Sequence, residues 1–310
     1  MSTYLITGGL GYLGSQIVSE LSSSDSKIII YDKSQYGLMH MPSIFASMKN
    51  PSNLEVVIGD IRDEKKIKGY INESDTIIHL AGLVGAPLVK RKAKEAEDTN
   101  INGTKVLTKL VSKNQRFLFA STGSTYGHVE GVCTEKTEIS PLSEYGLHKK
   151  IGEEITSEKD ATQMRFATVY GISPRTRNDL FINNMVRKAL IDQSVVLYQG
   201  YAKRTFAHVK DIARSVLFLS RLDSPHVGPI NIGDDRLSFT KLEICKSISN
   251  LTKFNIIEDD FSKDIDQRDY EVDYSLFNSL KFKFEEDYSE SLKQMLSYYR
   301  MFIDASYENG

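Results

Sequence analysis

Short, almost continuously apolar runs recur along the first half of the chain, and this recurrence limits the fold more than any other feature. The runs are TYLIT from Thr3, KIIIYD from Lys27, LEVVIGD from Leu54, DTIIHLAG from Asp75, RFLFAS from Arg116 and MRFATVYG from Met164. Because strands covered on both faces lack polar alternation, these runs predict buried parallel strands. Helical patterns separate them, such as Leu13, Ile17 and Leu21 at four-residue spacing. The alternation predicts an α/β fold with a doubly wound parallel sheet.

The regular alternation of predicted strands and helices changes after about Tyr170. A helix near residues 178–191, a short strand SVVLY and a loop QGYAKRTFAHV come next, before a helix at 210–222 and a strand PINIG that suit the main sheet. Two further helical patterns after Leu237 flank a charged segment. We therefore expect a large domain of residues 1–171 with about 206–234, and a smaller, discontinuous α/β lobe of about 172–205 and 235–310.

Composition narrows the class of partner. The 310 residues carry a formal charge of -2 and 40% hydrophobic residues, ordinary values that provide no basic field for nucleic acid. No basic leader with a long apolar run is present, which favours a cytoplasmic protein without a membrane partner. Cys133 and Cys245 lie far apart without metal-ligand spacing, so we expect free thiols and no metal. A small molecule is the expected partner.

A glycine-rich turn follows the first predicted strand. In TGGLGYLG, Gly8, Gly11 and Gly14 are spaced GxxGxxG, and a helix is predicted from about Tyr12. Glycine permits a tight turn and a close approach of the backbone to a pyrophosphate, and the helix N-terminus attracts that anion. Strand, turn and helix together predict a Rossmann-like, dinucleotide-binding domain.

Asp32 ends the second predicted strand, where a carboxylate accepts both hydroxyls of a dinucleotide's adenosine ribose. A 2′-phosphate would be repelled there, which favours NAD over NADP, although the neighbouring cation Lys33 leaves NADP open. Asp60 in GDIRD and the LAG at residues 80–82 end the next two strands. These side chains are therefore expected at the edge of the sheet that binds the ligand.

Tyr145 and Lys149 lie four residues apart in YGLHK, so both project from one face of a predicted helix. An ammonium beside a phenol favours the phenolate and lowers the pKa of the Tyr, which makes Tyr145 a usable proton acceptor or donor. The pair follows the fifth predicted strand and the hydroxyl cluster STGST at residues 121–125. This placement predicts proton transfer to or from a bound substrate.

With these motifs, the chain resembles the extended short-chain dehydrogenases/reductases of the NAD-dependent nucleotide-sugar epimerase/dehydratase family, nearly from end to end. The segments that carry the resemblance are TGGLGYLG, GDIRD, HLAG, NINGT, STGSTYG, YGLHK, RFATVYG, RTFAHVKD and NIG. The resemblance implies Thr122, Tyr145 and Lys149 as the catalytic set. Tyr145 would take the proton of a sugar hydroxyl, usually at C4, as hydride passes to NAD, while Thr122 orients that hydroxyl and Lys149 holds the nicotinamide ribose.

The resemblance also implies the ligand contacts. Those to NAD are Gly8, Gly11, Tyr12, Leu13, Asp32, Lys33, Asp60, Ile61, Leu80, Ala81, Gly82, Asn100, Tyr145 and Lys149. Those to a nucleotide-diphosphate sugar, held largely by the smaller lobe, are Val84, Ser124, Thr168, Arg177, Asn183, Arg204 and Arg268. The forked donors of Arg204 and Arg268 suit a diphosphate. Thr168 stands where many family epimerases have an asparagine.

The reaction that follows oxidation at C4 stays open. Family 4,6-dehydratases place Asp and Glu directly after the catalytic Thr, whereas Gly123 and Ser124 stand here, as small residues do in epimerases. We expect a 4-epimerase or a C4 dehydrogenase/reductase of surface-polysaccharide sugar biosynthesis, because the chain also resembles GDP-heptose 4-dehydrogenases. The alternatives are a 4,6-dehydratase and a catalytically silent dinucleotide-sensing protein. The family further implies a homodimer formed through a helix at residues 93–113 and the helix of Tyr145.

Overall fold

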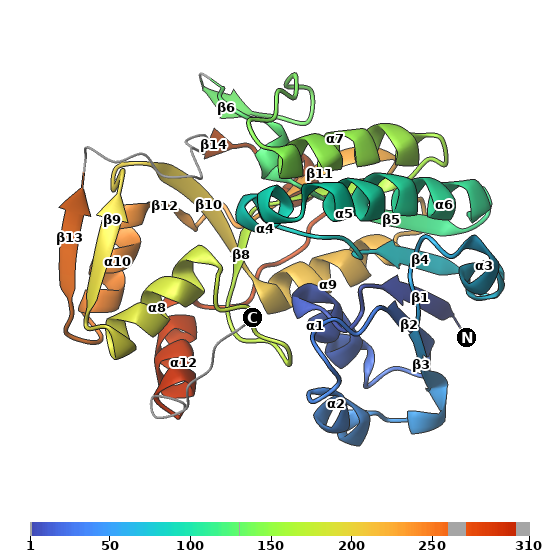
Figure 1. Cartoon of the computed structure of the whole chain (residues 1–310), viewed down its shortest axis with the longest axis horizontal. Helices are drawn as coiled ribbons and strands as arrows, with labels where there is room; N and C mark the ends of the chain where they lie inside the picture. Colours follow the sequence, from blue (N-terminus) through green and yellow to red (C-terminus); the bar gives the residue numbers. More distant parts are fainter. Residues whose placement is uncertain (1, 130, 260–270, 302–310) are drawn as a thin grey trace.

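The computed structural model describes residues 2–129, 131–259 and 271–301 of the chain. Within these ranges the largest sheet has seven strands, all parallel, in the spatial order β11, β7, β5, β4, β1, β2, β3 (Figure 1). The strands are β1 (Thr3–Thr7), β2 (Lys27–Asp32), β3 (Leu54–Ile58), β4 (Thr76–His79), β5 (Arg116–Thr122), β7 (Thr162–Phe166) and β11 (Gly228–Ile232). The chain runs outward from β1 in both directions, which confirms the predicted doubly wound sheet. Ligands of such sheets bind where the order reverses, here at the carboxyl ends of β1 and β4.

Helices cover both faces of the main sheet, because neighbouring residues of a strand point to opposite sides. Ile6 of β1 lies in one core with α1 (Tyr12–Leu21) and α9 (Val209–Ser220), whereas Leu5 lies in another with α3 (Glu64–Asn72) and α6 (Gly103–Leu110). Beside α6, α7 (Glu144–Ser157) packs along β5. One strand departs from the prediction of burial on both faces: β3 is an edge strand, and its Val56 and Ile58 are exposed.

The helix predicted at residues 93–113 is not regular. It follows α4 (Ala86–Arg91) and consists of α5 (Ala93–Glu97), a π-helical segment (Asp98–Asn102) and α6, which ends at Leu110. Segments of π-helix frequently occur at functional positions. This one carries Asn100, whose amide oxygen accepts the N–H of Leu83, in the loop after β4.

Three small sheets and a second apolar core complete the described part of the chain. The sheets are β8 (Thr168–Tyr170) with β10 (Lys203–His208) and β12 (Ser238–Thr240), β9 (Ser194–Tyr198) with β13 (Asn255–Asp259), and β6 (Val132–Cys133) with β14 (Glu271–Val272). The remaining helices are α2 (Met41–Ser47), α8 (Phe181–Ile191), α10 (Lys241–Ser249), α11 (Ser275–Ser279) and α12 (Tyr288–Arg300). Ile182, Ile244 and Met295 bring α8, α10 and α12 into the second core. The domain boundaries given above stay a prediction.

Two segments near this second core differ from the sequence interpretation. MRFATVYG is not one strand: β7 ends at Phe166, Ala167 donates its N–H to the carbonyl of Ile232, and β8 begins at Thr168. RTFAH, residues 204–208, placed in a loop by the sequence, lies in β10, which pairs with β8 in parallel and with β12 antiparallel. Both differences have one cause, since β8 leaves the main sheet and finds its hydrogen-bond partner in β10.

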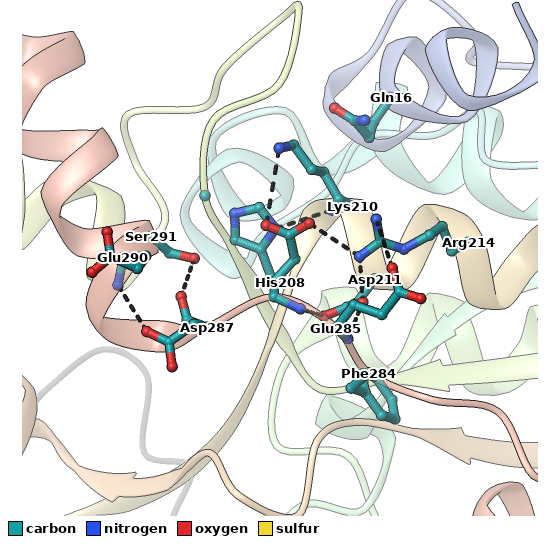
Figure 2. A network of polar contacts seen from close by, with 12 residues as sticks. Gln16, His208, Lys210, Asp211, Arg214, Phe284, Glu285, Asp287, Glu290 and Ser291 are labelled. Atoms are coloured by element: carbon teal, nitrogen blue, oxygen red, sulfur yellow. Dashed lines mark hydrogen bonds and ion pairs between the residues drawn. The ribbon is translucent and has the colours of Figure 1, made fainter. Parts of the chain in front are cut away.

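A polar network fixes the segment before α12 onto the start of α9 (Figure 2). The carboxylate of Asp211 accepts the backbone N–H groups of Glu285 and Glu286, each at 3.0 Å, and Arg214 contacts both Asp211 and Glu286. His208 lies 3.7 Å from a carboxylate oxygen of Glu286, yet burial lowers its pKa to about 4 and keeps it neutral at pH 7. The network therefore ties the second core to the main sheet. No helix within the described ranges has the length and apolar character needed to cross a membrane.

Candidate active site

The glycine-rich turn packs too tightly for side chains at two of its positions. Gly8 has a φ of +73°, and a Cβ atom there would lie 2.7 Å from the backbone nitrogen of Ala81. A Cβ atom on Gly14 would lie 2.3 Å from the carbonyl oxygen of Gly8. The turn is closed by the N–H of Gly11, which donates to the same carbonyl at 3.0 Å. This is a backbone cradle at the N-terminus of α1, the form of site that a dinucleotide pyrophosphate requires.

The other residues expected around the cofactor gather at the same sheet edge, but several of their side chains are already engaged. The hydroxyl of Tyr12 donates to the carbonyl of Gly171 at 2.8 Å, so only its backbone faces the turn. Ile61 is buried in the core beneath α3 and α6. Leu13 is half-buried and packs on the opposite core, and Leu80, Ala81 and Gly82 follow β4 directly.

Asp32 presents a carboxylate at the end of β2 that is held by two backbone N–H groups. Leu10 donates to it at 3.1 Å and Ser34 at 2.8 Å, and burial nevertheless raises the pKa of Asp32. Lys33 pairs with Asp60 at 3.3 Å, and the hydrogen bonds of Arg62, with a smaller contribution from Lys33, hold the pKa of Asp60 well below its usual range. Lys33, the cation next to Asp32, is therefore already paired with the carboxylate of Asp60.

Arg175 belongs to this region although the sequence interpretation did not place it there. Its guanidinium lies 3.7 Å from the ring centroid of Tyr36, in the loop after β2, and its charge lowers the pKa of Asp32 against the larger effect of burial. Its backbone N–H donates to Ser15 of α1 at 3.2 Å. The loop after β8 thus crosses to the cofactor edge of the main sheet, a contact between distant segments that no local motif indicates.

Thr122, Tyr145 and Lys149 lie on two neighbouring elements. Thr122 is the last residue of β5, and its hydroxyl contacts the backbone N–H of Ser124 at 3.2 Å. Tyr145, half-buried, lies in the first turn of α7, whose N-terminus is capped by Ser143 through the N–H of Gly146. Because α7 packs on both β5 and the 3₁₀ turn Gly123–Thr125, one side of the helix faces the end of the strand.

Lys149 is buried and donates from Nζ to the carbonyl of Ala120 at 2.6 Å, on the same strand as Thr122. Burial lowers the pKa of Lys149 to about 8, and the carboxylate of Glu153, one turn later on α7, opposes that shift. The ammonium also lies 4.8 Å from the ring centroid of Phe119. An ammonium group whose pKa lies close to neutral pH, one turn after Tyr145, is suited to stabilising a phenolate.

Residues expected to bind substrate fall into two groups. Thr168 and Arg204 line a pocket with Gly123 and Lys203, and the Arg204 guanidinium lies 5.6 Å from the ring centroid of Phe181. Ser124, within the 3₁₀ turn, and Val84, in the loop after β4, are both half-buried. Arg177 forms a forked pair with Asp179, at 3.0 and 2.5 Å. Burial opposes its charge, but Asp179 and, to a smaller extent, Tyr145 raise the pKa of Arg177, so its guanidinium lies near the start of α7. Arg268 lies outside the described residues.

Asn183, which is expected to contact the substrate, has an amide with hydrogen-bond partners inside the protein. It is fully buried, its Oδ1 accepts the N–H of Gly171 at 3.0 Å, and its Nδ2 donates to the carbonyl of Arg177 at 2.7 Å. Its amide therefore shapes the loop after β8 from inside the protein. Asn100 is similarly engaged, since Nδ2 donates to the carbonyl of Leu83 at 2.9 Å. Both side chains position loops that border the site.

Comparison with known proteins gives the family. Residues 4–233 match the profile of the NAD dependent epimerase/dehydratase family. The chain belongs to this family. Its cofactor is NAD, and the glycine cradle and Asp32 fit that dinucleotide. Among the described residues, no group of three or more His, Cys, Asp or Glu side chains could hold a metal ion.

Three proteins illustrate how this family member compares with its relatives. It is 27% identical over 253 residues to an uncharacterized UDP-glucose epimerase of Bacillus subtilis, a match that covers 77% of this chain and 79% of that one. It is 25% identical over 320 residues to a dTDP-glucose 4,6-dehydratase of Actinoplanes, covering 96% and 97%. The structure of MoeE5 in complex with UDP-glucose and NAD superposes with a TM-score of 0.80, at 25% identity over 96% of this chain and 99% of that one. Family membership alone therefore leaves the reaction open.

Proposed function

We propose that this protein oxidises a nucleotide-diphosphate sugar at C4 through a 4-keto intermediate, as a 4-epimerase or a C4 dehydrogenase/reductase. The proposal goes beyond the family, whose matched members include epimerases and dehydratases. Structural support comes from the placement of Thr122 and Lys149 on adjoining elements beside the cofactor edge, with Tyr145 one turn before Lys149.

One observation carries the choice of reaction: Gly123 and Ser124, in the 3₁₀ turn directly after Thr122, have no ionisable side chain. A small pocket beside Gly123 has the polar lining Arg165, Thr168, Lys203, Arg204, Thr205 and Tyr274. Removal of water from a 4-keto sugar needs an acid and a base besides Tyr145. Because Gly123 and Ser124 cannot supply them, we favour reduction or release of the keto sugar over elimination. Of the cations in this lining, Arg165 is bound to Glu153 and Lys203 to Glu271, so Arg204 is the one proposed to bind a diphosphate.

Each residue of the proposed catalytic set has a role that follows from its position. Tyr145, as phenolate, takes the proton from the sugar hydroxyl, and Thr122 orients that hydroxyl from the end of β5. Lys149 stabilises the phenolate through its charge. Bound NAD supplies a hydride acceptor for the carbon that carries the hydroxyl. Gly8, Gly14 and Asp32 hold the cofactor, and Arg204 binds the diphosphate.

The test is to identify products from a panel of UDP-, GDP-, dTDP- and CDP-sugars incubated with protein and NAD. We expect either an isomer of the substrate without net NADH or a 4-keto sugar with stoichiometric NADH. Nuclear magnetic resonance and mass spectrometry distinguish the two. Absence of any isomer, keto sugar or NADH across the panel would contradict the proposed enzyme and favour the catalytically silent protein.

The 4,6-dehydratase is retained as a second candidate, because the match to the Actinoplanes dehydratase spans nearly the full length of both chains. The same panel decides between the two. A product that has lost one molecule of water, with no net NADH, would establish the dehydratase and would place its acid and base outside the residues at positions 123 and 124.

The homodimer, the cytoplasmic location and a nucleotide-sugar-binding role for the smaller lobe stay parts of the proposal. Leu147 is exposed on α7 and Leu142 just before it, on the surface expected to meet a second copy. Sedimentation of the purified chain tests the dimer, and a strictly monomeric profile would contradict it.

A further inference from the structure

A row of polar side chains crosses three strands of the main sheet directly behind the proposed catalytic residues. Ser121 of β5, Arg165 of β7 and Asn231 of β11 are register partners, so their side chains lie side by side on one face. All three are buried. A buried row of this kind needs partners, because polar groups without hydrogen bonds are costly in the interior.

Glu153 of α7 supplies the main partner. Its carboxylate accepts Nε of Arg165 at 2.9 Å and Nη2 at 2.7 Å, and the Ser121 hydroxyl donates to it as well. Tyr126 covers the row: its hydroxyl accepts from Arg165 at 3.1 Å and donates to Asn231 at 2.6 Å. Glu153 and Arg165 are each about 5% exposed, so this ion pair is almost wholly removed from water.

Three consecutive residues of β5 are thereby tied to different partners. The carbonyl of Ala120 accepts the ammonium of Lys149, the hydroxyl of Ser121 binds Glu153, and Thr122 turns its hydroxyl toward the turn at residue 124. Lys149 and Glu153 are four residues apart on α7 and face the same strand. The helix and the strand end are thus joined at two successive points.

We propose that Glu153 and Arg165 are positioning residues, a buried ion pair that holds α7 against the end of β5 and fixes Lys149 relative to Thr122. The inference rests on the proposed catalytic roles of those two residues. Neither member of the pair is a catalytic residue, because both act through Lys149 and the Ser121–Thr122 strand end.

The charge of Glu153 has a second effect, on the protonation of Lys149. Burial lowers the pKa of Lys149 to about 8, and Glu153 is the group that opposes it. Among the described residues, the other titratable groups facing this region are His79 of β4, whose pKa burial lowers to about 3, and His148 of α7, whose pKa burial also lowers. Tyr145 lies one turn before Lys149, and Arg165 is bound to Glu153 and to Tyr126, whose pKa burial raises to about 12. Loss of the Glu153 charge should therefore let the pKa of Lys149 fall further and leave less ammonium at neutral pH.

The experiment compares four forms of the full chain: wild type, Glu153→Gln, the double variant Glu153→Gln with Arg165→Met, and Glu154→Gln. Glu154 is the adjacent, exposed glutamate of α7 and serves as the matched control. The single variant leaves Arg165 buried without a carboxylate, so we expect a lower thermal midpoint. In the double variant both charges are gone, and we expect the midpoint to return toward that of wild type.

The primary readout is the titration of Lys149, followed by nuclear magnetic resonance of isotope-labelled lysine side chains and assigned with Lys149→Arg. In both Glu153 variants we expect the Lys149 titration to move to lower pH by about one unit, the lower end of what a close opposite charge contributes. The Glu154→Gln titration should match that of wild type. This readout needs no substrate, so it remains decisive even when the proposed function fails.

Where the wild type turns over a nucleotide sugar, kcat at about pH 9 should fall about tenfold in both Glu153 variants, since one pKa unit corresponds to a tenfold change in protonation above the pKa. At pH 7 the fall should be only about twofold, because a Lys149 pKa of about 8 leaves most of the wild-type ammonium protonated there. The KM for the sugar should stay close to that of wild type. A Lys149 titration unchanged by Glu153→Gln, or a double variant that regains wild-type stability, titration and kcat together, would overturn the proposal and leave the pair a purely structural one.

Discussion

Gly14 is the position of the glycine-rich turn with the least room for a side chain. A Cβ atom there would lie 2.3 Å from the carbonyl oxygen of Gly8 and 2.6 Å from the Cα atom of Gly9, and neither backbone atom can rotate away. Because non-bonded heavy atoms settle at a separation of about 3.5 Å, Gly14→Ala must push the start of α1 away from the turn by roughly 1 Å. The N–H groups that face a pyrophosphate move with it.

The expected cost follows from this overlap. Overpacking of this kind costs about 1–3 kcal/mol, and a loss of that size in cofactor binding corresponds to a Kd for NAD about 5- to 150-fold higher. Titration calorimetry on NAD-free protein measures the affinity, and thermal unfolding without NAD reports how much of the strain falls on the fold. Both the affinity and the thermal midpoint should decrease.

Gly69→Ala is the matched control. Gly69 also lies within a helix, α3, but a Cβ atom there would meet nothing within 4 Å, and alanine is favoured over glycine in helices by about 1 kcal/mol. Its affinity for NAD should equal that of wild type, with an equal or higher thermal midpoint. A Gly14→Ala protein that binds NAD as tightly as Gly69→Ala would refute the assignment of this turn as the cofactor cradle.

Three further predictions concern single side chains. Tyr145→Phe should lower turnover by about 10²- to 10⁴-fold, the usual contribution of a positioned acid–base group, with an unchanged Kd for NAD; full activity would remove Tyr145 from its role. Asp32→Asn keeps one acceptor oxygen for the N–H of Ser34 but loses the negative charge that repels the 2′-phosphate of NADP. The ratio of NAD to NADP affinity should therefore fall by about tenfold, within the range of a close charge repulsion near the surface. An unchanged ratio in paired calorimetric titrations would place the adenosine ribose elsewhere. The pKa of His79 is about 3 in the folded protein, below its ordinary value of 6.5, so His79 binds its proton mainly in the unfolded chain. The free energy of unfolding should therefore fall as the pH drops below 6.5, by up to about 1.4 kcal/mol per pH unit. Urea unfolding of His79→Gln should show a flatter pH dependence, and an equally steep one would mean that other groups cause it.

The main sheet could be predicted from sequence because its strands are buried on both faces and therefore read as continuous apolar runs. The glycine turn, Asp32 and the Tyr145–Lys149 spacing are local patterns of the same kind, each contained in one short segment. The exposure of the edge strand β3 was harder to predict, since burial of a strand depends on its neighbours in the sheet. The division of MRFATVYG into β7 and β8 likewise depends on β10, whose residues lie more than thirty positions later.

The parts of the site that sequence reasoning missed are contacts between distant segments. Arg175 meets Tyr36 across 139 positions, a distance set by the fold and by no motif. Asn183 has a side chain of a type that often binds ligands, but its amide hydrogen-bonds to the backbone of the loop after β8. Glu153 had a weak signal, because it follows Lys149 by four residues on one helix face. Only the register of β7 shows that its partner is Arg165.

The central claim is that a substrate carbon transfers hydride to NAD while Tyr145 takes the proton of its hydroxyl. The most direct measurement is a rapid-mixing single turnover with a substrate identified from the nucleotide-sugar panel, deuterated at C4, followed in the near-ultraviolet band of reduced nicotinamide. The account predicts that reduced nicotinamide forms in wild type, forms more slowly from the deuterated sugar, and does not form in Tyr145→Phe. Product formation without reduced nicotinamide and without an effect of deuterium at C4 would contradict it.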